Sequence, residues 1–487
     1  MSDASRLELD HNEMRAFGYR IVDSIADHWA SLEGKPVAQT LAAGGVTDAL
    51  AQPLPAQPDS LDAVLDELQR EVFAHVAHVN HPRFFAFVPG PANFVGVMAD
   101  ALAAGYNVFT GTWLASSGAT RIELRVVDWL RRACGLPDGA GGLFVSGGSM
   151  ANIVGLAVAR HRMLDGPDPA ARIYFSAQTH ASVERGLRLL GFADAQSVRL
   201  PVDKNFRLDL RALAECIRTD RAAGFKPFCI VANAGTTNTG AVDLLPELAA
   251  LAREEKLWLH ADGAFGAAAA ISARGRSALA GLDQVDSLSI DPHKWLFQPF
   301  EIGCVLVRER DWLRAAFQVL PDYMRDTRTD AETINLGEYG PQLTRSFRAL
   351  KLWMSLRIFG VDAMVAAVER GFALAERAEA RLRALDGWHI ASPAQMAIVA
   401  FRYAPASVDA AAADALNAEI VRRLSAGGFA MLSSTRLNDR VALRLCTINP
   451  RTTDADIDAT VDHLDTLARA VAAERAGSAR TAAANRL

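Results

Sequence analysis

The chain is poor in cysteine for its length of 487 residues, and its cysteines are scattered. The number is odd, and no CxxC spacing occurs among Cys134, Cys216, Cys229, Cys304 and Cys446. This pattern argues against a disulfide framework and against a CxxC metal or redox site. Scattered thiols of this kind are expected to be buried and reduced, so we expect a cytoplasmic protein.

The chain also lacks a long apolar run and a strong excess of either charge. No run reaches the roughly 18 apolar residues of a membrane span, and the N-terminus MSDASRLELDHNEMR has no secretory-signal pattern. Its 51 basic and 56 acidic side chains leave a net charge of only −5. We therefore expect neither a nucleic acid nor a membrane as partner.

Half of the residues are hydrophobic, and the first apolar pattern is helical. Apolar residues recur at spacings of three and four, on one helix face, at Met14, Phe17, Ile21, Ile25, Trp29 and Leu32. A second helical pattern, LDAVLDELQREVFAHVAHV, ends before Pro82. These helices have little core of their own, so we expect residues 1–83 to be a helical segment that packs on a second subunit.

From residue 84 the pattern changes to short apolar runs separated by helical stretches. The runs are GGLFVSGG, ARIYFSAQ, FCIVANAG, LWLHADGA and SLSIDPHK. This alternation predicts an α/β fold with a doubly wound, mainly parallel sheet over residues 84–361. GCVLVRER is expected to be one more strand, at an antiparallel edge.

The remaining residues, 362–487, predict a small α+β domain. Long Ala/Arg-rich helical patterns alternate there with the short strands AIVAFRY and VALRLCTIN. The last residues, GSARTAAANRL, are expected to be a disordered tail.

Polar residues at the ends of the expected strands are candidates for chemistry, because ligands bind at the carboxyl ends of the strands in such sheets. Gly148 and Ser149 precede a helix and could hold an anion, although a plain structural turn is equally consistent. His180 and Thr236 follow the next strands, where a lone histidine or a polar turn is usually structural. Asp262 ends LWLHAD and should be partly buried, so it needs a partner.

Lys294 is the most informative residue, because it stands between His293 and Trp295 at the end of an apolar strand. Apolar neighbours remove water from an amine and make it easier to deprotonate, as a lysine that captures a carbonyl requires. Pyridoxal phosphate needs such a lysine, an acid for its ring nitrogen, an anion site and a flat group over its ring. Lys294, Asp262, the Gly148–Ser149 turn and His180 match these four needs in chain order.

With these residues the chain resembles a known family, the group II pyridoxal-phosphate decarboxylases, and most closely the aromatic-L-amino-acid decarboxylases. The motifs that carry the resemblance are HPRFFAFVPGPANFVG (81–96), GGSMAN (147–152), THASV (179–183), GTTNTGAVD (235–243), HADGAFG (260–266), DPHKW (291–295), PDYM (321–324) and LRLCTINPRTT (443–453). The resemblance implies fold type I, with an N-terminal dimer-swapped segment, a large cofactor domain, a small C-terminal domain and a homodimer.

The resemblance also implies roles for single residues. Lys294 would form the Schiff base with pyridoxal 5'-phosphate, and Asp262 would pair with the pyridine nitrogen. The remaining cofactor-binding residues would be His180 and Ala264 on the two ring faces, Thr236 beside the ring, and Gly148, Ser149 and His293 at the phosphate. The family often has Asn where Asp291 stands, so a contact of Asp291 with the phosphate is left open, as is any contact of Arg444.

Tyr323 lies in the polar stretch LPDYMRDTRTDAET, which by itself is consistent with a surface loop. The resemblance implies a catalytic loop whose tyrosine protonates the carbanion left by CO2. Relatives that make aldehydes replace this tyrosine, typically with phenylalanine. We therefore expect an amine product, with an aldehyde synthase as the alternative.

The family positions that match a substrate pocket carry no basic residue, which disfavours glutamate and favours an aromatic substrate such as Trp, Tyr, dopa or Phe. They are Phe84, Val88, Pro89, Phe109, Trp113 and Phe300. These side chains could equally be ordinary core, so a non-aromatic substrate stays an alternative. A non-catalytic binding protein with this fold is disfavoured because Lys294 and Asp262 are both present. The histidines of HVAHVNH are expected to belong to a helix end and not to a metal site.

Overall fold

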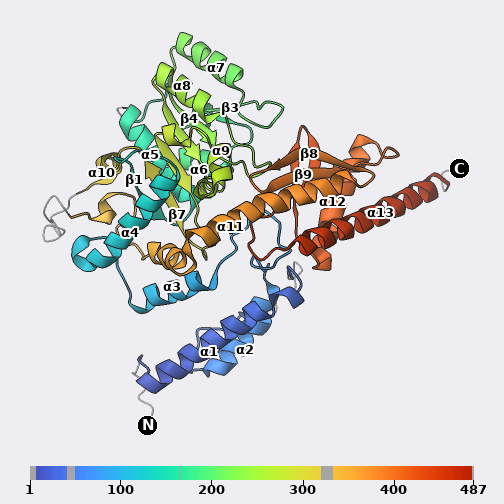
Figure 1. Ribbon diagram of the computed structural model, residues 1–487, viewed down its shortest axis with the longest axis horizontal. Helices are drawn as coiled ribbons and strands as arrows, with labels where there is room; N and C mark the ends of the chain where they lie inside the picture. Colours follow the sequence, from blue (N-terminus) through green and yellow to red (C-terminus); the bar gives the residue numbers. More distant parts are fainter. Residues whose placement is uncertain (1–6, 41–49, 165, 320–332, 485–487) are drawn as a thin grey trace.

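Seven strands form the central sheet, in the order β1-β7-β6-β5-β4-β2-β3 (Figure 1). The computed structural model describes residues 7–40, 50–164, 166–319 and 333–484. The strands are β1 (Gly141–Val145), β2 (Ala171–Ser176), β3 (Ser197–Leu200), β4 (Lys226–Asn233), β5 (Trp258–Asp262), β6 (Ser287–Ile290) and β7 (Gly303–Val307). Neighbours among β2 to β6 pair in parallel, as expected for fold type I.

Strand β7 corrects one expectation, because it lies inside the sheet and not at its edge. It pairs antiparallel with both β1 and β6. Cys304 and Leu306 belong to the core on one face of the sheet, while Val305 and Val307 belong to the core on the other. A strand that is buried on both faces needs neighbours on both sides to satisfy its backbone, and this explains the interior position.

Helices cover both faces of this sheet. One face is covered by α5 (Gly148–Met163), α6 (Ala181–Leu189) and α10 (Asp311–Phe317). The other is covered by α4 (Trp113–Ala133), α7 (Leu210–Ala222), α8 (Leu245–Glu255) and part of α11 (Ala349–Arg383). The short α9 (Ala273–Ala278) follows β5, and α3 (Phe94–Gly105) packs on α11.

A second sheet forms a smaller layer near the C-terminus. Its order is β10-β11-β9-β8, all antiparallel, with β8 (Trp388–Gln395), β9 (Ile398–Tyr403), β10 (Ser433–Leu437) and β11 (Arg440–Cys446). Helices α12 (Ala410–Gly427) and α13 (Asp454–Ala484) pack against it and against each other. Helix α13 continues to Ala484, within the segment expected to be a disordered tail, and that expectation stays a prediction.

Helix α11 is shared by the two cores. Its residues up to Phe372 pack in the core beneath the large sheet, whereas Leu374, Ala378 and Leu382 pack in the core of the small one. The helix is kinked at Gly360, whose φ of 77° is a conformation that favours glycine. The boundary expected at residues 361–362 falls inside this helix.

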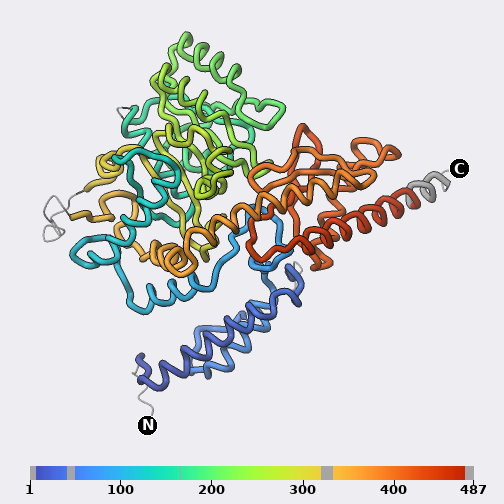
Figure 2. The backbone as a smooth tube through the Cα atoms, viewed as in Figure 1, coloured from blue at the N-terminus to red at the C-terminus, as the bar shows by residue number. Residues whose placement is uncertain are grey.

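The N-terminal helices α1 (His11–Ala30) and α2 (Leu61–Glu67) project from the rest of the molecule (Figures 1 and 2). They lie side by side, and Arg20 of α1 pairs with Asp62 of α2 at 3.0 Å. No residue of α1 is buried, and Met14, Phe17 and Tyr19 are exposed. The apolar pattern of α1 therefore correctly predicts a helix, but the chain itself does not bury the apolar side chains of that helix.

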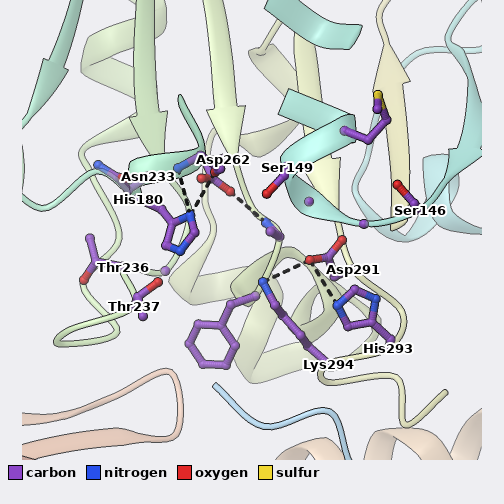
Figure 3. Close-up of a pocket in the computed structure, with 17 residues that line it drawn as sticks. Ser146, Ser149, His180, Asn233, Thr236, Thr237, Asp262, Asp291, His293 and Lys294 are labelled. Atoms are coloured by element: carbon purple, nitrogen blue, oxygen red, sulfur yellow. Dashed lines mark hydrogen bonds and ion pairs between the residues drawn. The ribbon is translucent and has the colours of Figure 1, made fainter. Parts of the chain in front are cut away.

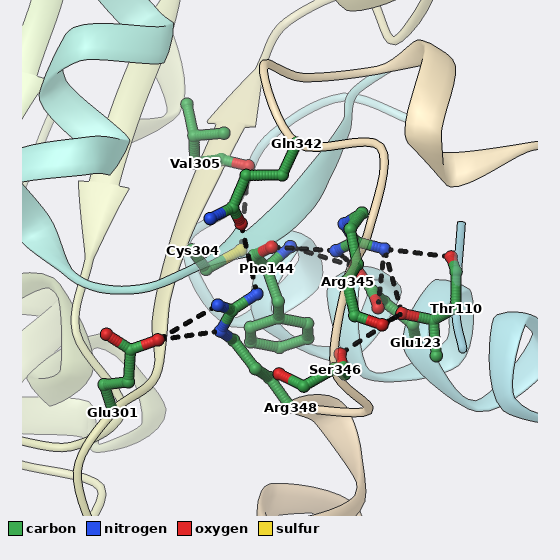
Figure 4. A network of polar contacts seen from close by, with 10 residues as sticks. All are labelled: Thr110, Glu123, Phe144, Glu301, Cys304, Val305, Gln342, Arg345, Ser346 and Arg348. Carbon is green, nitrogen blue, oxygen red and sulfur yellow. Dashed lines mark hydrogen bonds and ion pairs between the residues drawn. The ribbon is translucent and has the colours of Figure 1, made fainter. Parts of the chain in front are cut away.

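A buried polar network joins α4, β1 and the segment around residue 345 (Figure 4). Arg345 Nη2 lies 2.5 Å from Glu123 Oε1, and the guanidinium also donates to the carbonyl oxygens of Phe144 and Thr110. The Glu123 carboxylate in turn accepts from the backbone N–H of Phe144. Glu123 thus has a structural partner and does not face the cavity described below.

Within the described ranges, no helix is both long and apolar enough to cross a membrane.

Candidate active site

A cavity of about 340 Å³ opens at the carboxyl ends of the central strands (Figure 3). This is where ligands bind in open α/β sheets. It is lined by Ser146, Gly147, Gly148, Ser149, Met150, His180, Ser182, Asn233, Gly235, Thr236, Thr237, Asp262, Ala264, Phe265, Asp291, His293 and Lys294. Eight described residues expected to bind cofactor therefore meet here: Gly148, Ser149, His180, Thr236, Asp262, Ala264, His293 and Lys294.

The start of α5 provides one wall of the cavity. Gly147 precedes the helix, and no side chain caps its first N–H groups. A Cβ atom on Gly148 would lie 2.7 Å from Asp291 Oδ2 and 2.8 Å from Ala264 Cβ, so only glycine fits without displacing its neighbours. A ligand can therefore approach the backbone closely here, and the free N–H groups at the start of the helix are suited to bind a phosphate group.

Asp262 ends β5 on the floor of the cavity and is held by three donors. Its Oδ2 accepts from Asn152 Nδ2 at 3.0 Å, while Oδ1 accepts from Ser289 Oγ at 3.1 Å and from the Ala264 N–H at 3.2 Å. These donors favour a fixed carboxylate. It is well suited to pair with a protonated ring nitrogen.

A chain of hydrogen bonds behind Asp262 fixes the orientation of Asn152. Trp258 Nε1 donates to Ser287 Oγ at 2.8 Å, and that hydroxyl lies 2.7 Å from His260 Nδ1. Asn152 Nδ2 donates to Asp262, so Asn152 Oδ1 faces His260 Nε2 at 3.0 Å and accepts its proton, which leaves Nδ1 to accept from the Ser287 hydroxyl. Burial lowers the pKa of His260 to about 4, so its ring is neutral at neutral pH.

Asn152 and His260 were not anticipated as site residues, although a signal for each exists. Asn152 is four residues after Gly148, so both lie on the same side of α5. His260 is two residues before Asp262, on the same face of β5. Their side chains meet because β5 passes beneath α5, which local sequence patterns do not reveal.

His180 stands at the N-cap of α6, beside Asp262. Its Nδ1 accepts from the Ser182 N–H at 3.2 Å and lies 2.9 Å from Ser182 Oγ. Solvent reaches the ring through the cavity, but the surrounding protein removes enough water to lower the pKa of His180, and the Asp262 carboxylate only partly offsets this. The neutral, flat ring is suited to lie against an aromatic cofactor.

Lys294 enters the cavity from the turn after β6. Its Nζ lies 2.9 Å from Asp291 Oδ2, and the side chain is 24% exposed. Trp295 is fully buried and stacks on Phe265, with ring centroids 5.2 Å apart. The tryptophan anchors the turn, so the lysine between His293 and Trp295 is directed into the cavity.

Ala264 and Thr236 complete the lining. Ala264 is buried, and its small side chain leaves room beside Asp262. Thr236 Oγ1 lies 2.8 Å from Thr239 Oγ1 and accepts from the Ala241 N–H, which fixes the turn after β4.

The residues predicted for the substrate pocket do not line this cavity. Phe84 is buried and pairs with Met431, and Trp113 begins α4. Phe109 and Phe300 line a separate hollow of about 510 Å³ and are 37% and 61% exposed.

Phe300 does contact one residue of the cavity wall, since its ring centroid lies 5.1 Å from that of His293. A Cβ on Gly90 would come within 2.5 Å of its ring, so the backbone that follows Val88 and Pro89 packs against Phe300. The substrate pocket as a whole stays a prediction.

Two further candidate residues, Tyr323 and Arg444, and a possible metal site remain to be placed. Tyr323 lies outside the described residues. Arg444 is buried in β11, donates to Ser433 Oγ and does not line the cavity. Across the described part of the chain, no group of three or more His, Cys, Asp or Glu side chains is placed to hold a metal ion.

The residues present fit pyridoxal phosphate. The glycine turn at α5 suits its phosphate, the fixed Asp262 carboxylate its ring nitrogen, and Lys294 its aldehyde. The flat His180 ring and the small Ala264 leave room for a planar ring between them.

Comparisons with known proteins relate nearly the whole chain to proteins of one kind. The family model described as "Pyridoxal-dependent decarboxylase conserved domain" matches residues 45–404. The "Aromatic-L-amino-acid decarboxylase" of Bacillus atrophaeus is 47% identical over 93% of this chain and 95% of that protein. The "Phenylacetaldehyde synthase" of Arabidopsis thaliana is 29% identical over 92% of this chain and 94% of that protein. The crystal structure of Oryza sativa TDC with PLP and tryptamine has a TM-score of 0.91 at 28% identity, covering 96% of this chain and 99% of that one.

Proposed function

The chain belongs to the pyridoxal-dependent decarboxylase family, and from this premise we propose that it removes the carboxyl group of an aromatic L-amino acid, releasing CO2 and the amine. It uses pyridoxal phosphate as cofactor. The observation that best supports the proposal is the convergence of Lys294, Asp262 and the start of α5 on one cavity.

When bound, pyridoxal phosphate supplies an electron sink for the electron pair of the broken Cα–carboxylate bond. Lys294 would bind its aldehyde carbon through Nζ, and Asp262 would keep its ring nitrogen protonated. Gly148 and Ser149 would hold the phosphate through the start of α5, with His293 beside them. His180 and Ala264 would lie on the two ring faces, with Thr236 at the ring edge.

The remaining steps concern protons and orientation. His180 would lie near the substrate carboxylate and help to orient it, while apolar surroundings favour loss of the charge from that carboxylate. Tyr323 would protonate Cα after CO2 has left, which gives an amine. An aldehyde product would require dioxygen to react before this proton arrives.

The aromatic substrate is proposed from the residues at the predicted pocket. Phe84, Val88, Pro89, Phe109, Trp113 and Phe300 include no cation, so a second carboxylate on the substrate would be left unpaired. The name of the Bacillus atrophaeus relative, which is 47% identical, points to the same substrate class.

A homodimer is proposed because two apolar surfaces of the single chain are exposed to solvent. Helix α1 exposes Met14, Phe17 and Tyr19, and the hollow beside His293 exposes Phe109 and Phe300. A second subunit would bury the first surface and complete the second as the wall of the substrate pocket. All five cysteines are unpaired, which supports a location in the reducing cytoplasm.

The test is to supply the purified protein with pyridoxal phosphate and then with L-tryptophan, L-tyrosine, L-dopa, L-phenylalanine or L-glutamate, one at a time. Release of CO2 and the matching amine from an aromatic substrate is expected, and Lys294→Ala should abolish it. CO2 with aldehyde and peroxide would contradict the amine proposal, and turnover of L-glutamate alone would contradict the substrate class. Light scattering of the same sample measures the subunit number.

A further inference from the structure

The carboxylate of Asp291 is buried in the wall of the cavity, and none of the roles described so far uses it (Figure 3). Asp291 is only 2% exposed, directly after β6. Its Oδ2 lies 2.9 Å from Lys294 Nζ and 3.5 Å from His293 Nε2. Its Oδ1 is buried without a hydrogen-bond partner in the described part of the chain. A buried charge of this kind is costly unless a cation compensates it.

Two glycines form the space that this carboxylate occupies. A Cβ on Gly148 would lie 2.7 Å from Oδ2, and a Cβ on Gly303 would lie 2.8 Å from Oδ1. Larger residues at either position would displace the carboxylate. The start of α5 beside Oδ2 also stabilises a negative charge. The position of Asp291 is therefore determined by its surroundings on two sides.

A direct contact with the cofactor's phosphate does not explain an ionised Asp291. A carboxylate only accepts hydrogen bonds, and the oxygens of a phosphate dianion also only accept. Two such anions at contact distance repel each other. Asp291 must therefore act toward a cation.

Among the described residues, two basic side chains pair with the carboxylate within 4 Å, those of His293 and Lys294. Burial lowers the pKa of His293, so its imidazole is neutral at neutral pH. The other group is Lys294, whose Nζ is also the closer of the two. The ammonium of Lys294 is thus the partner of Asp291.

We propose that Asp291 is a positioning residue that holds the free ε-ammonium of Lys294 whenever this lysine is not bonded to the cofactor. The inference rests on the function proposed above, in which Lys294 is free before the cofactor binds and again while substrate takes its place. During these periods the ion pair holds the Lys294 ammonium at the cavity wall. Nζ must lose a proton before it can bond to a carbonyl carbon, so the pair slows cofactor capture.

The test compares the cofactor-free wild type with Asp291→Asn, which keeps the shape of the side chain and removes its charge. Pyridoxal phosphate is added at neutral pH, and the lysine-bound cofactor is followed by absorbance. Borohydride reduction and peptide mapping then show whether Lys294 carries it. Asp291→Asn should capture the cofactor several times faster than the wild type, because an amide does not form an ion pair with the Lys294 ammonium. Capture at the wild-type rate would overturn the inference.

A parallel titration separates Lys294 from the phosphate. Binding of 4'-deoxypyridoxine 5'-phosphate, which has no aldehyde, is measured in Lys294→Ala with and without Asp291→Asn. Asp291→Asn could raise the capture rate only by the factor by which it tightens binding of this analogue. That result would assign the effect to repulsion between Asp291 and the phosphate, and it would overturn the proposal. A wild type that never bonds the cofactor at Lys294 would instead refute the function proposed above.

Folding of the variant is also decisive. If Asp291→Asn does not fold, the double variant Asp291→Asn/Lys294→Met should fold again, because it no longer buries an unpaired ammonium. Failure of the double variant to recover would contradict an ion pair between these residues.

Discussion

Glu123 and Arg345 are 222 residues apart in the sequence and form an ion pair that is almost completely excluded from water. The pair fixes the segment around Arg345 to α4 and β1, next to the hollow that contains Phe109 and Phe300. Removal of one member would leave the other charge buried without its partner. Glu123→Gln and Arg345→Met should therefore each lower the free energy of unfolding by about 3–5 kcal/mol.

Urea unfolding measures this loss. The double variant Glu123→Gln/Arg345→Met should lose less than the sum of the two single changes, because it buries no lone charge. Additive losses would mean that the two side chains do not interact as an ion pair.

Asn152 should be a positioning residue for Asp262. Asn152→Ala removes the donor to Asp262 Oδ2 and the acceptor for His260 Nε2. We expect kcat to fall by about tenfold to a hundredfold because a key carboxylate is misoriented. We also expect a shifted absorbance of the bound cofactor, and KM should change little.

The matched control is Asn417→Ala in α12, which also removes a fully buried amide with three hydrogen bonds. Both variants should lose about 1–3 kcal/mol of stability for the groups left unsatisfied. Only Asn152→Ala should change the cofactor spectrum. An equal loss of kcat in the two variants would reduce the role of Asn152 to stability.

Acid should destabilise the protein through His260. Its pKa is lowered to about 4 in the folded protein from the ordinary value of 6.5, so between these two pH values the unfolded chain binds a proton that the folded chain does not. The contribution to stability is complete above pH 6.5 and is lost as the pH falls to 4. It amounts to about 3 kcal/mol.

The measurement is the free energy of unfolding at several pH values between 7 and 4. His260→Gln should show a shallower decline than the wild type, whereas His161→Gln, at an exposed position, should decline in parallel with it. Parallel curves for all three proteins would exclude His260 as the source of acid lability.

Tyr323 should decide the product. Tyr323→Phe removes the phenol proposed to protonate Cα, so dioxygen can react first. We expect the amine to be replaced by aldehyde, ammonia and peroxide, while CO2 release continues. Chromatography of the products and a peroxide assay distinguish these outcomes, and an undiminished yield of amine would disprove the assignment.

The meeting of the proposed cofactor-binding residues in one cavity could be predicted, because the local sequence marks the ends of the strands that carry or precede them. Asp262 ends one apolar strand and Lys294 lies in the turn after another, and parallel strands bring such ends to one edge of a sheet. Asn152 was missed because its partners Asp262 and His260 are more than 100 residues away. The interior place of β7 was missed for a similar reason, since an apolar strand of five residues does not reveal how many neighbours it has.

The substrate wall could be predicted only in outline. Phe109 and Phe300 are bulky and apolar, but their distance from the cavity depends on long-range packing that local sequence does not reveal.

The sharing of α11 between two cores has a thermodynamic consequence. Phe372 and Leu374 are two residues apart on one helix but belong to different cores, so neither core can lose its packing without loosening a helix that the other requires. The unfolding of one core is therefore coupled to the unfolding of the other through α11, and the large and small domains should melt as one cooperative unit.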